Sequence, residues 1–504
     1  MTILTAQFLL FFLVSLVVYR LVPARARWMA LMGFSLAFFT IVSGWKMLPY
    51  LAFGAAVTYA GAWAICGEGR TERQKKAILV ATVCLTVGEL AALKYLNIFP
   101  TTVNGLGRLF GVRIGLNTFS LIAPVGMSYY TLSLVGYVVD VYRGMYPAQP
   151  SFLRHLLFAG YYPALVSGPV MRYSEMGPQF IAPECRLDNI VPGVQRMVWG
   201  MFKKLVVADR LAIYTNQVFQ DYNDFGSLYI ILAVGIYAFQ IYADFSGCMD
   251  IVIGASEAYG IRLPENFDTP FLSRSLAEFW RRWHITLGTW SKDYIFYPLL
   301  KSEAFQRLGA WSRKAFGKKR GKQVPVFLGL LVNWLIIGFW HGASYKYIFA
   351  AGVLPWLLMT ASELMQPLFE KRKPLKEARS EHWGIHLLKS ARTLVLMCVI
   401  WLFACAPSFL GSFSVIRAIF TPFSLSATWA LHITKYDVLI IPVGLAALVT
   451  VDILKYKGLK LRESVNGNGI ALRWAVSLAL IFGTLIFGAY GPEYNAASFI
   501  YEAF

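Results

Sequence analysis

The sequence predicts an all-α polytopic membrane protein, and three features support this fold class. Hydrophobic residues make up 57% of the 504 residues and charged residues only 15%. The apolar residues gather in runs close to the roughly 20 residues that cross a bilayer as a helix. Basic residues stand in short groups between these runs. A soluble multidomain chain would carry more charge, so we set that class aside.

The formal charge of +20 agrees with this topology and does not call for a nucleic acid partner. Basic loops beside membrane helices stay on the cytoplasmic side, where they meet anionic lipid. A nucleic-acid-binding domain would instead gather its basic residues on one folded face. We therefore expect the lipid bilayer as a partner, and no nucleic acid. The basic groups lie at residues 20–27, 70–76, 313–322, 371–379 and 455–462.

The apolar runs suggest roughly eleven transmembrane helices, at about 20 residues per span. No basic residues precede the first run, so we read it as a retained span with its N-terminus outside. No fixed-period repeat and no low-complexity linker divides the chain, so we predict a single integral membrane domain over residues 1–504. A C-terminal helical extension would occupy about 385–504. The runs are 3–19, 28–42, 47–65, 77–96, 119–139, 228–254, 324–339, 347–359, 388–406, 438–453 and 474–489.

Several segments depart from a simple span. Pro124 and Gly126 interrupt the run 119–139 and predict a kink. The segment 156–170 contains Tyr-Tyr-Pro and Ser-Gly-Pro, which predicts a broken or re-entrant helix. The segment 191–207 is amphipathic, and we expect it to lie on the membrane surface. In the fourth run, Glu89 and Lys94 are one to two turns apart, and we expect them to pair.

The sequence argues against metal chemistry and several familiar catalytic motifs. No cysteine lies at metal-ligand spacing from a histidine and no Cys-x-x-Cys pair occurs, so we expect no metal site and no disulfide framework. The motifs of serine hydrolases, zinc proteases and P-loop ATPases are absent. His432 and Asp437 form a His-x-x-x-x-Asp spacing without further support, and we interpret them as a solvated span edge. The six cysteines are Cys66, Cys84, Cys185, Cys248, Cys398 and Cys405.

Among the six histidines, His341 stands apart because it follows an uncharged apolar run, 328–340. A neutral imidazole there can accept a proton from a hydroxyl, which is general-base chemistry. A hydrogen-bonded core histidine that ends a helix, with Gly342 as its C-cap, fits the same pattern. The bare sequence leaves both readings open. Four others lie at span edges or in polar loops, and we interpret them as structural or solvated: His155, His382, His386 and His432.

The sixth histidine, His284, lies in the segment 278–288 beside two arginines and two tryptophans. An arginine at a helix centre in lipid costs about 2.5–3.5 kcal/mol on insertion scales. Arg281 and Arg282 can hold phosphates through forked hydrogen bonds, which gives them a use there. An interfacial anchor, with Trp280 among the belt residues and the arginines reaching the headgroups, fits as well. These residues alone decide nothing between the two.

Motifs between about residues 120 and 345 resemble the membrane-bound O-acyltransferase (MBOAT) family. The resemblance is to its bacterial branch of alginate O-acetyltransferases and D-alanyl lipoteichoic acid transfer proteins. The most specific motifs are Phe279-Trp280-Arg281-Arg282-Trp283-His284 and Trp340-His341-Gly342. The others are Pro124-Val125-Gly126-Met127-Ser128-Tyr129-Tyr130, Asp140-Val141-Tyr142-Arg143, Tyr162-Pro163-Ala164-Leu165-Val166-Ser167-Gly168-Pro169, Tyr242-Ala243-Asp244-Phe245-Ser246-Gly247, Asn266-Phe267 and Asp293-Tyr294.

The resemblance implies a ring of tilted helices around a central tunnel, where a cytoplasmic donor path meets an outer acceptor opening. It makes His341 the catalytic histidine and His284 a second position that is catalytic or orients the donor. The supporting residues would be Asp244, Asn266 and Trp340. Arg281, Arg282 and Trp283 would bind the donor. Lys203 or Lys204 would be further ligands of its phosphates.

One segment departs from the polysaccharide acetyltransferases of this branch. These usually continue into Pro-Leu-Gly-Gly-Asn-Arg, whereas this chain reads Tyr297-Pro298-Leu299-Leu300-Lys301-Ser302 and then a longer basic loop. The departure weakens assignment to the alginate group and leaves the core motifs untouched. The length favours the acetyltransferases over the D-alanyl transfer proteins, which are typically shorter.

We therefore expect a multi-pass enzyme of the bacterial cytoplasmic membrane that transfers a small acyl group, acetyl in the first instance. The acceptor would be a hydroxyl of an extracytoplasmic polysaccharide or cell-wall polymer. The donor would be a thioester substrate, acetyl-CoA or an acyl carrier phosphopantetheine, with no tightly bound cofactor. An acidic carrier protein and an extracytoplasmic acyltransferase are expected partners. The alternatives are D-alanyl transfer to teichoic acid, a transporter or flippase without chemistry, and a non-catalytic scaffold.

Overall fold

The computed structural model describes residues 3–181, 186–342, 344–370, 383–422 and 434–490. These residues are helical almost throughout, and their β pairing is a single bridge between Phe267 and Trp283. Nine helices in this part of the chain are long and apolar enough to cross a membrane, and two shorter apolar helices, Ala6–Leu21 and Phe409–Ile419, accompany them. The predicted all-α polytopic membrane fold is confirmed.

Contacts divide the described residues into two compact units. The first takes those within 1–201 and 248–265, and the second takes 202–247 with those after 265. The long helix α12 (Ser227–Ala258) contributes residues to both. The expected single domain, ring and tunnel stay predictions.

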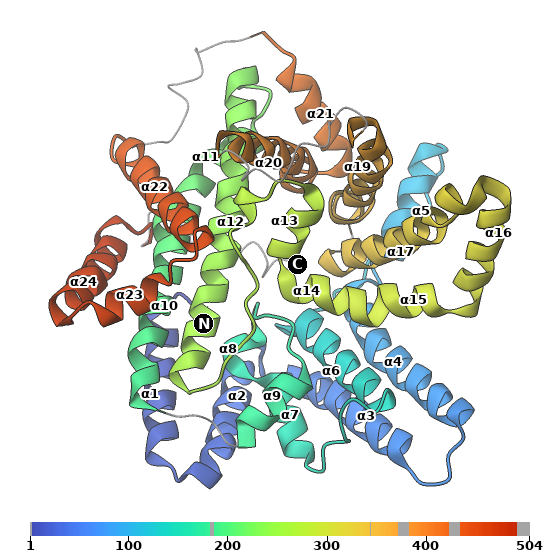
Figure 1. The fold of residues 1–504 in the computed structure, drawn as a ribbon, viewed down its shortest axis with the longest axis horizontal. Coiled ribbons are helices and arrows are strands. Elements are labelled where there is room, and N and C mark those ends of the chain that lie inside the picture. The colour runs from blue at the N-terminus through green and yellow to red at the C-terminus, as the bar shows by residue number, and fades with distance from the viewer. Residues whose placement is uncertain (1–2, 182–185, 343, 371–382, 423–433, 491–504) are drawn as a thin grey trace. The chain divides into compact units, whose positions relative to one another are not determined.

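In the first unit, α3, α4 and α6 pack against one another, and α7 packs against α2 and α3 (Figure 1). Three hydroxyls meet in its core, where Ser15 Oγ lies 2.9 Å from Tyr162 Oη and 2.5 Å from Tyr259 Oη. Hydrogen bonding of this kind lets polar groups be buried among apolar helices. The helices are α1 (Ala6–Leu21), α2 (Arg27–Ser43), α3 (Leu48–Cys66), α4 (Glu72–Lys94), α5 (Ile98–Leu109), α6 (Met127–Tyr142), α7 (Phe152–Gly160), α8 (Tyr162–Leu165), α9 (Tyr173–Ile181) and α10 (Ile190–Met201).

Two glycines let α10 and the end of α12 approach closely within this unit. A Cβ on Gly193 would lie 2.6 Å from the carbonyl oxygen of Gly254, and one on Gly254 would lie 2.5 Å from that of Gly193. Small residues at a helix crossing permit such contact between backbones. Beside it, Arg196 bonds Asp250 at 2.8 Å and both carboxylate oxygens of Glu265 at 2.7 and 2.6 Å.

Three predictions have clear outcomes in this unit. The segment 156–170 is broken as expected, because α7 ends at Gly160 and α8 begins at Tyr162. The predicted span 119–139 is wrong in extent, since α6 begins only at Met127, after a left-handed Gly126. The predicted pairing of Glu89 with Lys94 is also wrong. Both carboxylate oxygens of Glu89 are buried without a hydrogen bond from the described residues, and Lys94 donates to Ser128 at 2.8 Å.

The second unit contains three π-helical segments, η4 (Phe202–Ala208), η6 (Lys292–Phe296) and η7 (Phe349–Val353). Such segments occur frequently at functional sites because they redirect side chains within a helix. The other helices are α11 (Asp209–Gln220), α13 (Leu276–Arg282), α14 (Ile285–Ser291), α15 (Tyr297–Lys301), α16 (Glu303–Gly321), α17 (Gln323–His341), α18 (Tyr345–Ile348), α19 (Leu354–Glu370), α20 (Trp383–Cys405), α21 (Phe409–Ile419), α22 (Asp437–Tyr456), α23 (Leu461–Gly467) and α24 (Ile470–Phe487).

The segment 191–207 is not the surface helix that its pattern predicts. It divides into α10 and η4, and the charged Arg196, Lys203 and Lys204 are all buried. Burial is tolerated because each cation meets an oxygen: Arg196 meets Asp250 and Glu265, Lys203 meets Ser246 at 2.9 Å, and Lys204 meets two carboxylates. A hydrophobic pattern does not reveal such partners when they lie on other helices.

Candidate functional site

His284 lies at the junction between α13 and α14 in a left-handed conformation, with φ 49° and ψ 50°. This region costs a non-glycine residue about 1–2 kcal/mol, so the surroundings must hold it. Backbone bonds do so on both sides of the histidine. Ile285 N donates to Asn266 O at 3.0 Å, and Asp268 N donates to Arg282 O at 2.9 Å. The bend turns the imidazole into the protein, where it is only 4% exposed.

The side chain of Asn266 fixes the tautomer of His284. Its Oδ1 accepts from the backbone N of Thr286 at 3.0 Å and from Thr286 Oγ1 at 2.9 Å. A backbone N–H can only donate, so the atom facing it is the amide oxygen. The same oxygen lies 3.3 Å from His284 Nδ1, which must therefore carry the hydrogen. In the neutral ring this leaves the lone pair on Nε2.

The structure brings His341 to the same place as His284. His341 is the last residue of α17, and its ring centroid lies 6.3 Å from that of His284, at 64°. The ring of Trp340 lies 5.9 Å from His284 and 5.0 Å from His341. His341 is 9% exposed, so both imidazoles are buried. Two distant motifs thus form one pair of histidines within the second unit.

The end of α17 is held by a close helix contact. A Cβ on Gly338 would lie 3.1 Å from Ile348 Cα and from Gly352 Cα. The two glycines therefore let α17 pack directly on α18 and η7. This contact lies one turn before His341, so it holds the end of α17 that carries His341 in place against α18 and η7.

Burial lowers the pKa of His284 well below its usual value of 6.5, and the neighbouring His341 lowers it further. The cause is desolvation, which disfavours the charged imidazolium. His284 is therefore neutral near pH 7. A neutral imidazole with a free lone pair is the form in which histidine acts as a base.

Aromatic side chains pack the site from behind. Trp283 is buried, and its indole stacks on Phe279 at 5.4 Å and lies 5.2 Å from Trp401. These contacts give Trp283 a packing role, while its predicted contact with a donor stays a prediction. On the other side of α13, Trp280 packs on Trp334 of α17 at 4.8 Å. Phe245 of α12 meets the His284 ring edge to face at 4.9 Å.

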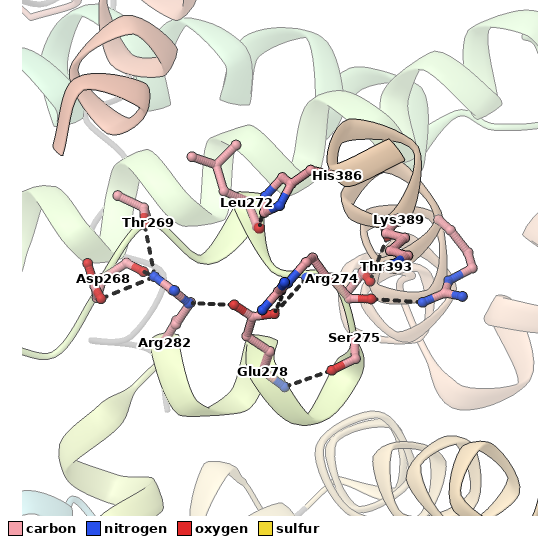
Figure 2. Close-up of polar contacts among 11 residues, drawn as sticks. Asp268, Thr269, Leu272, Arg274, Ser275, Glu278, Arg282, His386, Lys389 and Thr393 are labelled. Atoms are coloured by element: carbon pink, nitrogen blue, oxygen red, sulfur yellow. Dashed lines mark hydrogen bonds and ion pairs between the residues drawn. The ribbon is translucent and has the colours of Figure 1, made fainter. Parts of the chain in front are cut away.

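The two arginines predicted to bind the donor differ in their surroundings. Arg282 is held by Glu278 at 3.3 Å and by Asp268 at 3.2 Å, and it also bonds Thr269 at 3.2 Å (Figure 2). Its guanidinium lies 5.2 Å from the centroid of the Tyr456 ring on α22. Arg281 is exposed, and it forms no hydrogen bond or ion pair with the residues that the structure describes. Of these two arginines, Arg281 is therefore the one that is open to an anion.

Asp244 belongs to a buried ion network. Lys204 Nζ lies 2.5 Å from Asp244 Oδ1 and 2.8 Å from Asp209 Oδ1. Lys204 is 1% exposed, so its side chain is not accessible to the donor phosphates that it was predicted to contact. Asp244 directly precedes Phe245, which contacts His284. The sequence predicted Asp244 as a supporting residue but did not predict its ionic partners Lys204 and Asp209, although the adjacent lysines of η4 were a signal.

The remaining histidines fit structural readings where the structure describes them. His155 is buried, and its Nε2 lies 2.9 Å from Thr58 Oγ1. His386 Nε2 donates to the carbonyl oxygen of Leu272 at 3.0 Å (Figure 2). His382 and His432 lie outside the described residues.

The reading of Asp437 as a solvated span edge is wrong. It is buried and forms an ion pair with Arg210 that joins α22 to α11. Within the part of the chain that the structure describes, no cluster of three or more metal-ligating side chains occurs.

Comparison with known proteins gives a family match for the part of the chain that contains His284. The family model of membrane-bound O-acyltransferases matches residues 146–312. A probable alginate O-acetylase of Azotobacter vinelandii is 33% identical over 342 residues, 67% of this chain and 64% of its own. A peptidoglycan O-acetyltransferase of Helicobacter pylori is 30% identical over 330 residues, 60% of this chain and 58% of its own. A teichoic acid D-alanyltransferase of Streptococcus thermophilus is 28% identical over 295 residues, 55% and 62% of the two chains.

The matched regions cover less than two thirds of the length of each of these relatives. The family model includes His284 and the residues that hold it, and the probable alginate O-acetylase matches this chain over 342 residues, more than the model covers. The many membrane-length helices agree with the multi-pass character of this family. The chain belongs to the membrane-bound O-acyltransferase family.

Proposed function

We propose that this protein is an O-acyltransferase of the bacterial cytoplasmic membrane that transfers an acetyl group from a cytoplasmic thioester to a hydroxyl of an extracytoplasmic polymer. The observation that carries the proposal is the buried pair of His284 and His341, with ring centroids 6.3 Å apart. The names of the relatives, which concern acetylation of alginate or peptidoglycan and D-alanylation of teichoic acid, support the reaction class. A transporter gives this pair no chemical task.

The pair supports acyl transfer through a single proton that is taken up and returned. A histidine lone pair, that of His341, takes the proton of the acceptor hydroxyl while the oxygen attacks the thioester carbonyl carbon. The carbon–sulfur bond then breaks, and the leaving thiolate receives the same proton from the imidazolium. The products are one ester and one thiol, and His341 returns neutral. His284 Nε2, whose lone pair is set by Asn266, would orient the hydroxyl or share this proton.

Arg281 is the residue best suited to meet a phosphate of the donor. It is exposed one turn before His284, and Arg282 beside it is already neutralised by carboxylates. Arginine binds phosphate through two parallel hydrogen bonds. Acetyl-CoA and a carrier-bound phosphopantetheine both carry such a phosphate. An acidic carrier and an extracytoplasmic partner acyltransferase belong to the same proposal.

The test is transfer of label from acetyl-CoA in membranes that contain the intact protein, the His341→Ala form or the His284→Ala form at matched abundance. We expect labelled polymer or a released labelled product with the intact protein, and a loss of at least a hundredfold with His341→Ala. His386→Gln is the matched control, because its ring bonds a backbone carbonyl away from the pair. Equal transfer by the intact and His341→Ala forms would remove His341 from the chemistry.

A second candidate is D-alanyl transfer from a carrier protein, which the teichoic acid relative favours. The same membranes, supplied with a D-alanyl thioester of a carrier protein, test it directly. Transfer of D-alanine without transfer of acetyl would replace the first candidate by the second. Transfer of neither group would contradict the proposal of an acyltransferase.

A further inference from the structure

Two buried polar atoms near the histidine pair have no hydrogen-bond partner among the described residues. One is a donor, the indole Nε1 of Trp280, and the other is an acceptor, the side-chain oxygen of Asn333. Asn333 is only 6% exposed. Buried polar groups are nearly always hydrogen-bonded, because leaving one unpaired is costly. A buried donor and a buried acceptor on packed helices are therefore two places where a ligand can supply the missing hydrogen-bond partner.

Both atoms belong to the elements that carry the two histidines. Trp280 lies on α13, one turn before His284, and its ring packs on Trp334 of α17. Residues seven apart share a helix face. Asn333 thus shares a face with Trp340, and Trp334 shares one with His341. The ring of Trp340 in turn contacts His284. Trp280, through its ring contact with Trp334, and Asn333, the residue before Trp334, therefore belong to one layer of α17, about two turns nearer to its start than the histidine pair.

This layer lies toward the basic end of α17. The helix begins at Gln323, directly after Lys318, Lys319, Arg320 and Lys322. The positive-inside rule places such a basic end in the cytoplasm. Two helical turns span about 10 Å. A substrate that enters from the cytoplasm would therefore pass this layer before its reactive group reaches the histidines.

We propose that Trp280 and Asn333 bind an amide group of the donor's pantetheine arm. The Trp280 N–H would donate to the amide carbonyl, and Asn333 Oδ1 would accept from the amide N–H. An amide offers one acceptor and one donor, which matches the two buried atoms. The length of the arm fits as well. The layer lies two helical turns, about 10 Å, from the histidines, and roughly three peptide-like units of 3.5 Å each cover that distance. CoA and carrier-bound phosphopantetheine share this arm. The inference rests on the proposed acyl transfer.

The test compares donors with and without amides on two variants. Trp280→Phe removes the N–H and keeps a ring on Trp334, and Asn333→Leu removes the acceptor at similar volume. With acetyl-CoA we expect KM to rise about tenfold for each variant, because one partner of a buried hydrogen bond is lost. With S-ethyl thioacetate, which has no amide, both variants should match the intact protein. Trp311→Phe, at an exposed tryptophan of α16, is the matched control.

The outcomes separate this inference from the proposed function. An equal loss with both thioesters would assign the two residues to packing, and no change with acetyl-CoA would exclude the amide contact; either result overturns the inference while transfer itself persists. If the intact protein uses only a carrier-bound D-alanyl thioester, the variants should show the same tenfold rise in KM for that carrier. Transfer from no thioester at all would overturn both. If Asn333→Leu does not accumulate, Trp280→Phe carries the test alone.

Discussion

His284 Nδ1 donates a hydrogen bond to Asn266 Oδ1 across 3.3 Å, and this contact decides which ring nitrogen of His284 faces the reaction. The same oxygen accepts two bonds from Thr286, which hold it in place. A carbonyl oxygen that orients an imidazole from behind is a recurring arrangement in sites where histidine acts as a base or ligand. Asn266 is therefore a positioning residue, one contact away from the chemistry.

Replacing Asn266 by leucine should lower kcat by about ten- to a hundredfold and leave the donor KM within a few-fold, because the tautomer of His284 is no longer fixed. Thr286→Val is the control. It removes the Thr286 Oγ1 bond to Asn266 and leaves the bond to His284 intact. Kinetics in detergent or nanodiscs measure both. A loss in Thr286→Val as large as that in Asn266→Leu would mean that local folding, not the tautomer, is affected.

Stability should depend on pH through His284. Burial first, and His341 second, lower its folded pKa below the usual 6.5. The unfolded chain therefore binds a proton below about pH 6.5 that the folded protein does not. The stability contributed by the neutral ring is fully present above pH 6.5. It falls by up to about 1.4 kcal/mol per pH unit as the pH drops from there toward the folded pKa.

The measurement is the thermal unfolding midpoint of the intact protein and of His284→Gln between pH 8 and pH 5. Glutamine does not titrate, so the difference between the two proteins isolates this one group. We expect that difference to be constant above pH 6.5 and to shift against the intact protein below it. A difference that is the same at pH 5 and pH 8 would show that the His284 pKa is not lowered in the folded state.

The part of the site that the sequence predicted came from two short motifs. His284 and His341 stand in strings whose composition is unusual for lipid, and the structure brings these histidines together. The broken segment 156–170 was readable because Tyr-Tyr-Pro at 161–163 and Ser-Gly-Pro at 167–169 are local signals. Helix identity was readable because apolar runs of membrane length leave few other choices.

What the sequence did not predict depends on partners far apart in the chain. Lys204 looked like a phosphate ligand because Asp244, 40 residues away, could not be placed beside it. Arg282 and Arg281 looked equivalent, although Glu278 stands four residues before Arg282 and was a readable sign of an ion pair within the helix. The polar atoms of Trp280 and Asn333 became candidates only when α13 was seen to pack on α17.

Substitutions of Arg281 and Arg282 should have different effects, the first on the KM for the donor and the second on the stability of the protein. Arg281→Gln removes an exposed cation without partners among the described residues, so we expect normal stability and a donor KM raised about ten- to a hundredfold. Arg282→Gln takes the cation away from Asp268, whereas Glu278 keeps its ion pair with Arg274 at 3.4 Å. Because Asp268 is half-exposed, the loss of stability should be only about 1 kcal/mol. KM for acetyl-CoA and thermal unfolding of each variant check both statements. If Arg282→Gln raises KM as much as Arg281→Gln, the division of roles between the two arginines is wrong.

Among the lysines that the structure describes, Lys204 should be the most costly to neutralise. Lys204→Met removes the cation that contacts the buried carboxylates of Asp244 and Asp209, and breaking a buried ion pair typically costs about 3–5 kcal/mol. Lys203→Met, at the neighbouring buried lysine that donates to Ser246 Oγ at 2.9 Å, is the matched comparison. Adding Asp244→Asn and Asp209→Asn to Lys204→Met removes all three charges and should recover part of the stability. Thermal unfolding in one detergent ranks the three proteins.

The rate of acyl transfer by these variants then tests what the network supports. Asp244 precedes Phe245, whose ring lies 4.9 Å from that of His284. A displacement of Asp244 would therefore also move Phe245, which packs against His284. We expect Lys204→Met to have a lower kcat than the intact protein at temperatures at which the variant is still folded. Lys204→Arg keeps the charge and should retain most of the kcat. A Lys204→Met protein that is less stable but turns over normally would confine the network to folding, and the geometry of His284 would then depend on Asn266 and the backbone bonds around it.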